Sequence, residues 1–456
     1  MTTIVIGAGL AGLVCARSLA ANGEDVRVLE RSERPGGVIR TERREGFLLE
    51  MGPNTVRPTA ELLALVRELG LESEVVLSDP RLPRYIDWNG VLHPLPSSPI
   101  SLARTRLLSP RGKLRLVREP FVRRASLSAP PETVRAFFSR RLGTEVAERV
   151  IAPFVSGIFA GDPGRLSADD AFPALVRGER LRGSLFATAI GAMRKRDRSA
   201  PRVRGLLSFR NGLETLPRAL AAALGSRLET GTAVESISPA NGGWAVRTSR
   251  GAFDADRVVI ASAAGDAARF VREFDAEAFV ALSSVPSPPI AVLHFSWPAS
   301  ALPRGLRGFG HLAVPAPGRR VLGAVWSSSL FSGRAPEGEH LVTAFAGGAR
   351  DPGAAGLPEE EISRIAGREL RQSVRAASEP RLVALTRWPR AIPQYEIGHG
   401  HRMSVLARAE SRWRGLAFLG SYRGGISVGD VVRSALAIPP GDLAQRPAPE
   451  LMAPLR

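Results

Sequence analysis

The chain has 456 residues, of which 44% are hydrophobic, and its 62 Lys and Arg outnumber its 44 Asp and Glu to give a net charge of +18. A chain of this length usually folds into two or three domains. The single cysteine, Cys15, excludes a disulfide framework and a cysteine-ligated metal site. The positive charge has two interpretations: the codon bias of a GC-rich genome, which favours arginine, or an anionic partner. No recognised motif favours nucleic acid as that partner.

The apolar pattern bears on the location of the protein. No apolar run reaches the ~18–20 residues that a transmembrane helix needs. We therefore expect a cytoplasmic protein that is free in solution or lies on the inner membrane surface. His399 and His401 have no supporting carboxylates or cysteines nearby in the sequence, so we expect no metal site there.

A dinucleotide-binding βαβ unit is predicted first in the chain, with its strand, helix and second strand at residues 3–6, 10–21 and 26–29. Gly7, Gly9 and Gly12 follow the first strand with the spacing Gly-x-Gly-x-x-Gly. The first glycine permits a tight turn, the second lets the backbone approach a pyrophosphate, and the third lets the helix pack closely on the strand. Glu30 ends the second strand, where its carboxylate can accept hydrogen bonds from ribose hydroxyls.

A second set of nucleotide-binding elements is predicted near the other end of the chain. Residues 257–262 and 416–419 predict parallel strands, and a glycine-rich turn separates the second of them from a helix that begins near Val428. The turn would bring N–H groups to a pyrophosphate, and the helix would point its positive end at the cofactor. The first strand and Asp430 must then lie close together, so the nucleotide-binding domain is assembled from separate pieces of the chain.

Several separated segments resemble the oxygen-dependent protoporphyrinogen oxidases, which are FAD-dependent flavoproteins of the amine-oxidase-like group. These segments are residues 50–55, 84–96, 155–163, 209–217, 393–399 and 419–430, whereas residues 34–41 resemble the Arg-x-Gly-Gly-Arg-x-x-Ser/Thr segment of the wider amine-oxidase-like group. The middle and C-terminal segments, such as Val-Ser-Gly-Ile-Phe-Ala-Gly-Asp-Pro at 155–163, are more specific than the first. Val38 replaces an arginine of the family pattern. The resemblance spans residues 1 to about 435, whereas 187–204 and the last twenty residues match poorly.

The resemblance implies an α/β fold with a Rossmann-like FAD-binding domain, an α+β substrate domain and a helical, membrane-facing insertion. We expect the FAD-binding domain to comprise residues 1–90, 205–263 and 396–456. The helical insertion is expected over 99–204 and the substrate domain over 264–395.

The resemblance also implies where FAD is bound. The expected contacts are Gly7, Gly9, Leu10, Ala11, Gly12, Glu30, Arg31, Gly36, Gly37, Gly52, Pro53, Asn54, Val234, Ala261, Ser262, Gly420, Ser427, Val428 and Asp430. Val234 would contact adenine through its backbone, and the paired glycines Gly36 and Gly37 allow close approach of the backbone to the cofactor.

The substrate of this family is a tetrapyrrole that carries carboxylates, so its site needs an apolar slot and a cation. By its place in the motif, Arg84 is expected to bind a propionate through its planar guanidinium. Leu312, Val325 and Phe345 are expected to contact the rings, and Asn54 is the candidate for orienting the substrate or the flavin.

The implied reaction converts protoporphyrinogen IX into protoporphyrin IX in haem biosynthesis. A hydride passes from a meso carbon to flavin N5 with loss of a pyrrole proton, and the step is repeated until the ring is aromatic. Dioxygen then reoxidises the flavin and yields hydrogen peroxide. The expected partners are the porphyrinogen, dioxygen, an anionic membrane surface and, as a candidate, a second copy of the chain.

The helical insertion carries the basic segments that suggest the membrane surface. Residues 104–124 hold eight Lys and Arg interleaved with leucines, and residues 194–198 add a second basic cluster. Basic amphipathic segments bind anionic headgroups through apolar burial and charge attraction. A solvated face in an arginine-rich protein is the alternative.

Other functions stay open at this stage. An amine oxidase or carotenoid desaturase would share both ends of the chain, but residues 157–163 and 393–395 argue against them. Oxidation of coproporphyrinogen III to coproporphyrin III is a closer alternative, although residues 50–54 favour protoporphyrinogen. A flavin-binding protein without turnover and a cationic nucleic-acid-binding protein are weaker alternatives.

Overall fold

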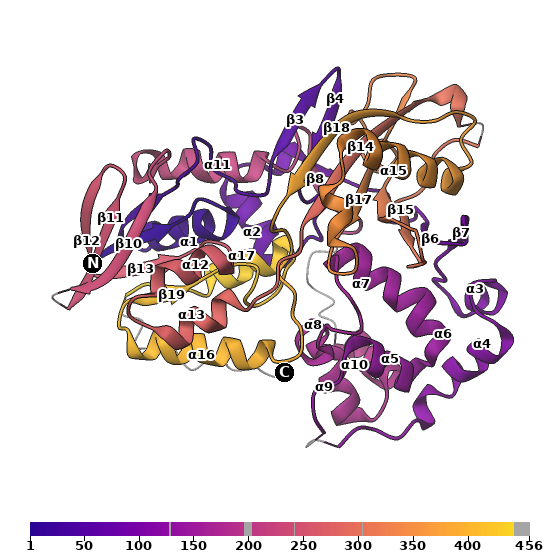
Figure 1. The fold of residues 1–456 in the computed structure, drawn as a ribbon, viewed down its shortest axis with the longest axis horizontal. Coiled ribbons are helices and arrows are strands. Elements are labelled where there is room, and N and C mark those ends of the chain that lie inside the picture. Colours follow the sequence, from indigo (N-terminus) through magenta and orange to yellow (C-terminus); the bar gives the residue numbers. More distant parts are fainter. Residues whose placement is uncertain (127–128, 196–202, 241, 303, 442–456) are drawn as a thin grey trace.

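The computed structural model describes residues 1–126, 129–195, 203–240, 242–302 and 304–441. Three regions are visible in Figure 1: one built on a parallel sheet, one built on a seven-stranded sheet, and a group of helices. Residues 196–202 of the expected insertion, which include part of the second basic cluster, and residues 442–456 of the expected FAD-binding domain lie outside the described residues.

A five-stranded parallel sheet of order β19-β13-β1-β2-β9 forms the core of the first region. Its strands are β1 (Thr2–Ile6), β2 (Asp25–Leu29), β9 (Leu228–Glu229), β13 (Arg257–Ile260) and β19 (Leu416–Phe418). β1 and β13 are mainly apolar and almost fully buried, as expected of central strands that helices cover on both faces. Strands from three distant parts of the sequence therefore share one sheet.

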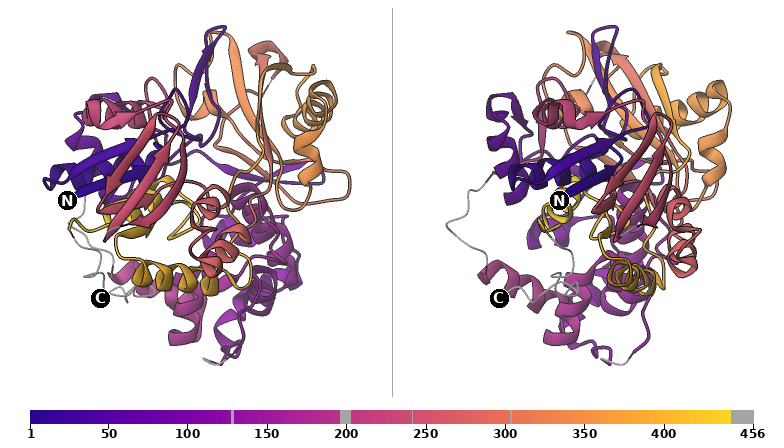
Figure 2. Two further views of the ribbon diagram at one scale, coloured as in Figure 1. Left: turned by 60° about the vertical axis from the view of Figure 1, so that its left-hand side comes forward. Right: turned by 90° about the vertical axis from the view of Figure 1, so that its left-hand side faces the viewer.

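Helices cover both faces of the parallel sheet. On one face they are α1 (Leu10–Ala21), α2 (Ala60–Glu68), α11 (Thr215–Leu224) and α17 (Val428–Leu436). On the other face they are α12 (Ala264–Val271), α13 (Ala276–Ser283) and α16 (His399–Arg412). Figure 2 shows an antiparallel sheet beside them, formed by β10 (Val234–Ala240), β11 (Gly243–Thr248) and β12 (Gly251–Ala255).

The second region is built on a sheet of order β18-β14-β17-β16-β15-β6-β7. Its strands are β6 (Arg84–Trp88), β7 (Val91–Pro94), β14 (Ile290–Pro298), β15 (Gly310–Ala313), β16 (Val321–Val325), β17 (Glu339–Gly347) and β18 (Arg381–Trp388). All pairs are antiparallel except β15–β6. One face packs on α15 (Glu359–Val374) and buries Phe295 and Trp297 completely. Figure 1 shows α15 on this side of the sheet.

Two short strand pairs connect these regions. β3 (Thr41–Arg44) pairs with β4 (Phe47–Glu50), and β5 (Val75–Leu77) pairs with β8 (Leu207–Phe209). Phe47 and Leu49 on β4 pack against Leu341 and Val383 of the seven-stranded sheet. The residues that follow β4 therefore lie between the parallel sheet and the seven-stranded sheet.

The helical region lies below the seven-stranded sheet in Figure 1. It comprises α3 (Pro99–Arg104), α4 (Pro110–Val117), α5 (Val134–Leu142), α6 (Thr144–Val146), α7 (Ala152–Phe159), α8 (Ala168–Ala171), α9 (Pro173–Arg182) and α10 (Leu185–Lys195). Phe137, Phe138 and Val155 belong to its own small core. α7 reaches the seven-stranded sheet and packs on β15 and β16.

The expected mixed α/β fold is confirmed. β19 and the start of α17 at Val428 also agree with the predicted elements to within a residue. In the part of the chain that the structure describes, no helix combines the length and apolar character that crossing a bilayer requires.

Candidate flavin and substrate site

The turn after β1 packs tightly on one side and is open on the other. A Cβ atom on Gly12 would lie 2.0 Å from the carbonyl oxygen of Gly7, and Gly7 itself has φ +105°, which L side chains rarely adopt. A Cβ atom on Gly9 would meet nothing within 4 Å, and no side chain caps α1 at this position. The first turn of α1, with Leu10 and Ala11, is therefore suited to bind a pyrophosphate.

The paired glycines form the next wall of this nucleotide cradle. The Gly36 N–H donates to the Ala8 carbonyl oxygen at 2.8 Å, and Gly37 adopts φ +58°. A Cβ atom on Gly37 would lie 3.2 Å from the Cα of Gly9. The predicted close approach of this segment to the cofactor turn thus has a structural basis.

Gly52 extends the same arrangement towards the second region. A Cβ atom on Gly52 would lie 2.0 Å from the Val38 carbonyl oxygen. Pro53 and Asn54 follow, and the Asn54 side-chain amide donates to the Gly52 carbonyl oxygen at 3.1 Å. Close packing of the backbone therefore runs from the βαβ turn through Gly36 and Gly52 to Asn54.

Glu30 lies at the end of β2 beside the turn. Its carboxylate accepts hydrogen bonds from the N–H groups of Ala8 at 2.7 Å and Ser32 at 2.9 Å. Each carboxylate oxygen can accept further bonds, so the predicted ribose contact is compatible with these two. Arg31 is exposed and its guanidinium lies 3.4 Å from the carboxylate of Asp266.

Val234 lies next to this ribose end of the cradle. The Thr232 N–H donates to the Glu30 carbonyl oxygen at 2.8 Å, and the buried Val234 side chain packs in the same core as Leu29. The structure thus places Val234 near Glu30, and its contact with adenine stays a prediction.

Residues that follow the parallel strands lie at one edge of the sheet. Gly7, Ala261 and Gly420 are the residues that come soon after β1, β13 and β19, and these three strands are parallel. A Cβ atom on Gly7 would lie 2.9 Å from the Ala261 carbonyl oxygen. The hydroxyl of Ser262 is buried and has no partner among the described residues, which suits a polar ligand at this edge.

α17 provides a second helix N-terminus. Ser427 caps the helix, since its Oγ accepts a hydrogen bond from the Asp430 N–H at 3.1 Å. Val428 is the first helical residue, and α17 packs along α1. The two helices follow parallel strands of one sheet, so both present their positive ends at the edge that carries Ser262.

On the substrate side, Arg84, Leu312, Val325 and Phe345 share one face of the seven-stranded sheet. The registers that align them are Arg84↔Gly310↔Val325 and Leu312↔Gly323↔Phe345. Directly opposed residues point to the same side of a sheet, and so do residues two apart on one strand. This face is opposite the one that α15 covers. Arg84 is exposed, with its guanidinium 5.3 Å from the ring centre of Phe309.

Two other parts of the molecule approach this face. A Cβ atom on Gly157 of α7 would lie 2.3 Å from Cδ2 of Leu312. From the residues after β4, the Met51 carbonyl oxygen accepts a hydrogen bond from the Trp388 indole at 2.7 Å. This face of the sheet therefore lies next to α7 and to residues 50–55.

A cavity joins Asn54 to Val325. Its lining residues are Leu48, Glu50, Asn54, Thr55, Val325, Ser327, Leu330, Phe331 and Arg334. Two of them are buried charged groups, because Glu50 is only 5% exposed and Arg334 only 3%. Burial raises the pKa of Glu50 to about 7, although hydrogen bonds and the charge of Arg334 oppose the rise. Sequence reasoning did not find Arg334, because it belongs to no motif.

The more specific motifs contact each other. The Gln394 side-chain amide donates to the Phe159 carbonyl oxygen at 2.8 Å. The Tyr395 hydroxyl donates to the Ser421 carbonyl oxygen at 2.6 Å and accepts from the Gly425 N–H at 3.0 Å. Residues 393–395 therefore connect the end of α7 with the glycine-rich turn before α17.

His399 packs between the motif at residues 393–395 and the glycine-rich turn. Its Nε2 lies 3.0 Å from the Tyr422 carbonyl oxygen, and its ring stacks on Tyr395 with the ring centres 4.1 Å apart. Within the described ranges, no group of three or more His, Cys, Asp or Glu side chains could hold a metal ion.

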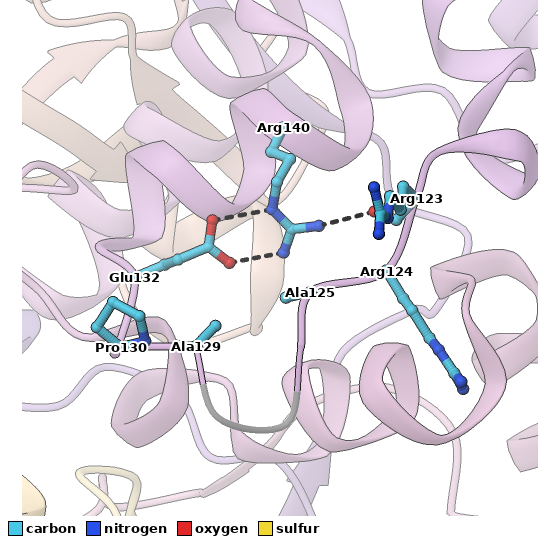
Figure 3. A pocket seen from close by; sticks show the side chains of 7 residues that line it. All are labelled: Arg123, Arg124, Ala125, Ala129, Pro130, Glu132 and Arg140. Atoms are coloured by element: carbon cyan, nitrogen blue, oxygen red, sulfur yellow. Dashed lines mark hydrogen bonds and ion pairs between the residues drawn. The ribbon is translucent and has the colours of Figure 1, made fainter.

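A second hollow lies in the helical region (Figure 3). It is lined by Arg123, Arg124, Ala125, Ala129, Pro130, Glu132 and Arg140. Figure 3 shows Arg140 bonded to Glu132, and Arg140 also pairs with Glu179 at 3.1 Å. None of the predicted site residues lines this hollow, so we do not assign the active site to it.

A cradle built from a βαβ turn and a second helix N-terminus, beside the substrate face of a seven-stranded sheet, defines a flavoprotein. The flavin-containing amine oxidoreductase family matches residues 10–437. The chain belongs to this family, and its cofactor is FAD. The open turn at Gly9 and the unpartnered Ser262 hydroxyl fit that cofactor.

Within this family, the chain is similar to enzymes that are named as porphyrinogen oxidases. The chain is 34% identical to chloroplastic protoporphyrinogen oxidase of Nicotiana tabacum, over 95% of this chain and 84% of the relative. It is 27% identical to coproporphyrinogen III oxidase of Bacillus subtilis (strain 168), over 94% and 95%. The solved structure of reduced UDP-galactopyranose mutase shares the fold, with a TM-score of 0.73 at 15% identity over 96% of this chain and 94% of that one. The chain is thus an FAD-dependent oxidoreductase similar to protoporphyrinogen oxidases.

Proposed function

We propose that this chain oxidises protoporphyrinogen IX to protoporphyrin IX in haem biosynthesis. The observation that supports this most strongly is the sheet face shared by Arg84, Leu312, Val325 and Phe345, which adjoins Asn54 through the cavity. An apolar surface with a cation at its border suits a tetrapyrrole that carries carboxylates.

Each residue has a separate task in this proposal. FAD would supply the hydride acceptor when bound, with dioxygen as the proposed final electron acceptor and hydrogen peroxide as its product. Arg84 binds a propionate through its guanidinium, which no carboxylate of the chain pairs within the described residues. Leu312, Val325 and Phe345 hold the macrocycle and exclude water, and the Asn54 amide orients it.

Two observations lead us to propose protoporphyrinogen IX, rather than coproporphyrinogen III, as the substrate. The segment at residues 50–54 has the Glu-x-Gly-Pro-Asn pattern of protoporphyrinogen oxidases. Identity to the tobacco protoporphyrinogen oxidase, 34%, also exceeds that to the Bacillus coproporphyrinogen III oxidase, 27%.

The proposal is tested by the cofactor's own absorbance without air. Adding protoporphyrinogen IX anaerobically to the purified FAD-bound protein should bleach the oxidised flavin band as porphyrin appears, and admitting air should restore it. A flavin band that does not change, in protein that is reducible by dithionite, would contradict the proposal.

We also propose that the helical region lies against an anionic membrane surface. Residues 99–204 hold 22 Lys and Arg against nine Asp and Glu. On and after α4, the apolar side chains Leu114, Val117 and Phe121 are 52%, 64% and 89% exposed. Exposed apolar groups among cations are the combination that binds headgroups and the acyl boundary together.

Vesicle sedimentation tests this second proposal. The protein should sediment with phosphatidylglycerol vesicles and less with phosphatidylcholine vesicles, and salt should weaken the binding. Val117→Ser with Phe121→Ser should reduce sedimentation, whereas Val280→Ser, at a residue that is 62% exposed in the nucleotide-binding region, should not. An equal loss of vesicle binding in the double variant and in Val280→Ser, or no binding of wild type to either lipid, would contradict this proposal.

A further inference from the structure

Glu50 is a buried carboxyl group that faces the cavity between Asn54 and Val325. Leu48 and Glu50 lie on the same side of β4, because alternate residues of a strand share a side, and both line the cavity. Leu49, between them, packs on the opposite side against the seven-stranded sheet. The carboxyl group of Glu50 thus lies on the side of β4 that borders the candidate substrate site.

Two donors hold this carboxyl group in place. The Thr41 hydroxyl donates to Oε2 at 2.7 Å, and the Leu213 N–H donates to Oε1 at 2.8 Å. Each oxygen therefore retains a lone pair for a further partner. The two donors stabilise the ionised form, whereas burial favours the protonated form.

Three other charged or titratable groups face Glu50. Arg334 lines the cavity with it, and its Nη2 donates to Ser208 at 2.7 Å while its Nη1 has no partner among the described residues. Glu214 interacts with it unfavourably, and the His294 ring lies 3.1 Å from its backbone oxygen. Burial keeps the His294 ring neutral, since its pKa is lowered to about 4. Among the described residues, Arg334 is thus a cation whose charge lowers the pKa of the carboxyl group.

The proposed reaction needs a proton acceptor at this place. The full oxidation removes three hydrides from meso carbons for FAD and three protons, two from pyrrole nitrogens and one from the fourth meso carbon. When a pyrrole N–H bond breaks, its electron pair stays on nitrogen as a lone pair, and its proton leaves for a base. Arginine cannot serve as the base, because it stays protonated in proteins.

Resting on the proposed function, we propose that the Glu50 carboxylate accepts the protons that leave the pyrrole nitrogens during the oxidation. Among the described residues that line the cavity, Glu50 and Arg334 are the titratable ones, so Glu50 is the one that can take up a proton. Arg334 acts as a positioning residue that keeps Glu50 ionisable despite its burial. A pKa of about 7 lets the carboxyl group release the proton to solvent between steps.

Substituting Glu50 itself and substituting a neighbour that shifts the pKa of Glu50 should change the pH profile of kcat in different ways. Wild-type kcat should fall on the acid side with a midpoint near the pKa of Glu50. Glu50→Gln should lower kcat about 10²–10⁴-fold and remove that acid limb. Glu50→Asp should recover part of the rate together with the limb.

Thr41→Val and Arg334→Gln keep Glu50 but remove a group that lowers its pKa. Both should move the acid limb to higher pH. Arg334→Gln should leave KM nearly unchanged, because Arg334 acts on Glu50 and not on the substrate in this proposal. A limb that stays in place in both variants, or that survives in Glu50→Gln, would overturn the assignment. Because Thr41→Val is isosteric, it decides the question even where Glu50→Gln fails to fold.

A readout independent of turnover comes from infrared difference spectra of the resting FAD-bound protein. A protonated carboxyl band should disappear between about pH 6 and about pH 8 and should be absent from Glu50→Gln. Absence of the band from wild type would overturn the assignment. If the wild-type protein oxidises neither porphyrinogen, the proposed function is wrong. If the protein is active but the acid limb of its pH profile does not depend on Glu50, only the assignment of Glu50 is wrong.

Discussion

The nucleotide cradle and the substrate face of the seven-stranded sheet are built in different ways. The cradle consists mostly of backbone, and at Gly12 and Gly52 an added Cβ atom would lie 2.0 Å from a carbonyl oxygen. The substrate face consists of side chains, including an exposed Arg84 and a Leu312 that contacts α7 through its flexible end. At Gly12 and Gly52 the cradle should therefore tolerate no added atom, whereas the activity should change by degrees when the substrate face is substituted.

The largest effect is expected at Gly12. Gly12→Val should abolish FAD binding and lower the free energy of unfolding by more than the about 1–3 kcal/mol usual for overpacking, because the clash is with backbone that cannot move aside. Bound flavin absorbance and denaturant unfolding measure both effects. Gly356→Ala, where a Cβ atom meets nothing within 4 Å, is the control, and FAD-bound Gly12→Val protein would break the comparison.

Acid should destabilise the whole protein through buried histidines. Burial lowers the pKa of His294, His311 and His399 to about 4, below their unfolded value of 6.5. The unfolded chain then binds protons that the folded chain cannot, so stability is lost as pH falls from about 6.5 towards about 4, on the order of 2 kcal/mol per histidine by about pH 5.

Urea unfolding at about pH 7 and about pH 5 measures this loss. Glu50 contributes with the opposite sign, since its raised pKa makes stability fall as pH rises from 4.5 to about 7. His311→Gln should flatten the acid slope, and Glu50→Gln should steepen it. An unchanged slope in both variants would contradict these assignments.

Arg84→Gln should act on the substrate alone. Loss of a charged hydrogen bond costs about 1.5–3 kcal/mol, so KM should rise about 10–100-fold while bound FAD is unchanged. Arg408→Gln, at an exposed arginine of α16, should leave KM unchanged. Loss of FAD from Arg84→Gln would show that the two sites are not separate.

Gly157→Ala should have the smallest effect. The added Cβ atom would meet Cδ2 of Leu312, the end of a flexible side chain, so Leu312 can shift. We expect kcat/KM to fall by about tenfold or less, within the about 1–3 kcal/mol range of overpacking. The double variant with Leu312→Ala should be less impaired than the sum of both single variants predicts, and strict additivity would contradict the contact.

The sequence could predict the parts of the site that lie in short motifs. The glycine spacing from Gly7 to Gly12 and the start of α17 at Val428 depend on local turn and helix signals. Arg84 could be chosen by motif, but its place on the same face as Leu312 depends on the parallel pairing of β6 with β15, which joins residues more than 200 positions apart. No local pattern encodes such a register.

The hydrogen-bond partners and the burial of Glu50 could not be predicted from the sequence either. Its donors come from Thr41 and from Leu213, which is 163 residues away, and Arg334 reaches the same cavity from a loop without a motif. Burial raises the pKa of this glutamate and its long-range hydrogen bonds oppose the rise, and neither effect can be inferred from residue type.

The most direct test of the substrate assignment compares two porphyrinogens in air. Purified FAD-bound protein should produce porphyrin fluorescence from protoporphyrinogen IX well above autoxidation, and faster than from coproporphyrinogen III. Faster oxidation of coproporphyrinogen III, or rates equal to the enzyme-free control for both substrates, would contradict the assignment.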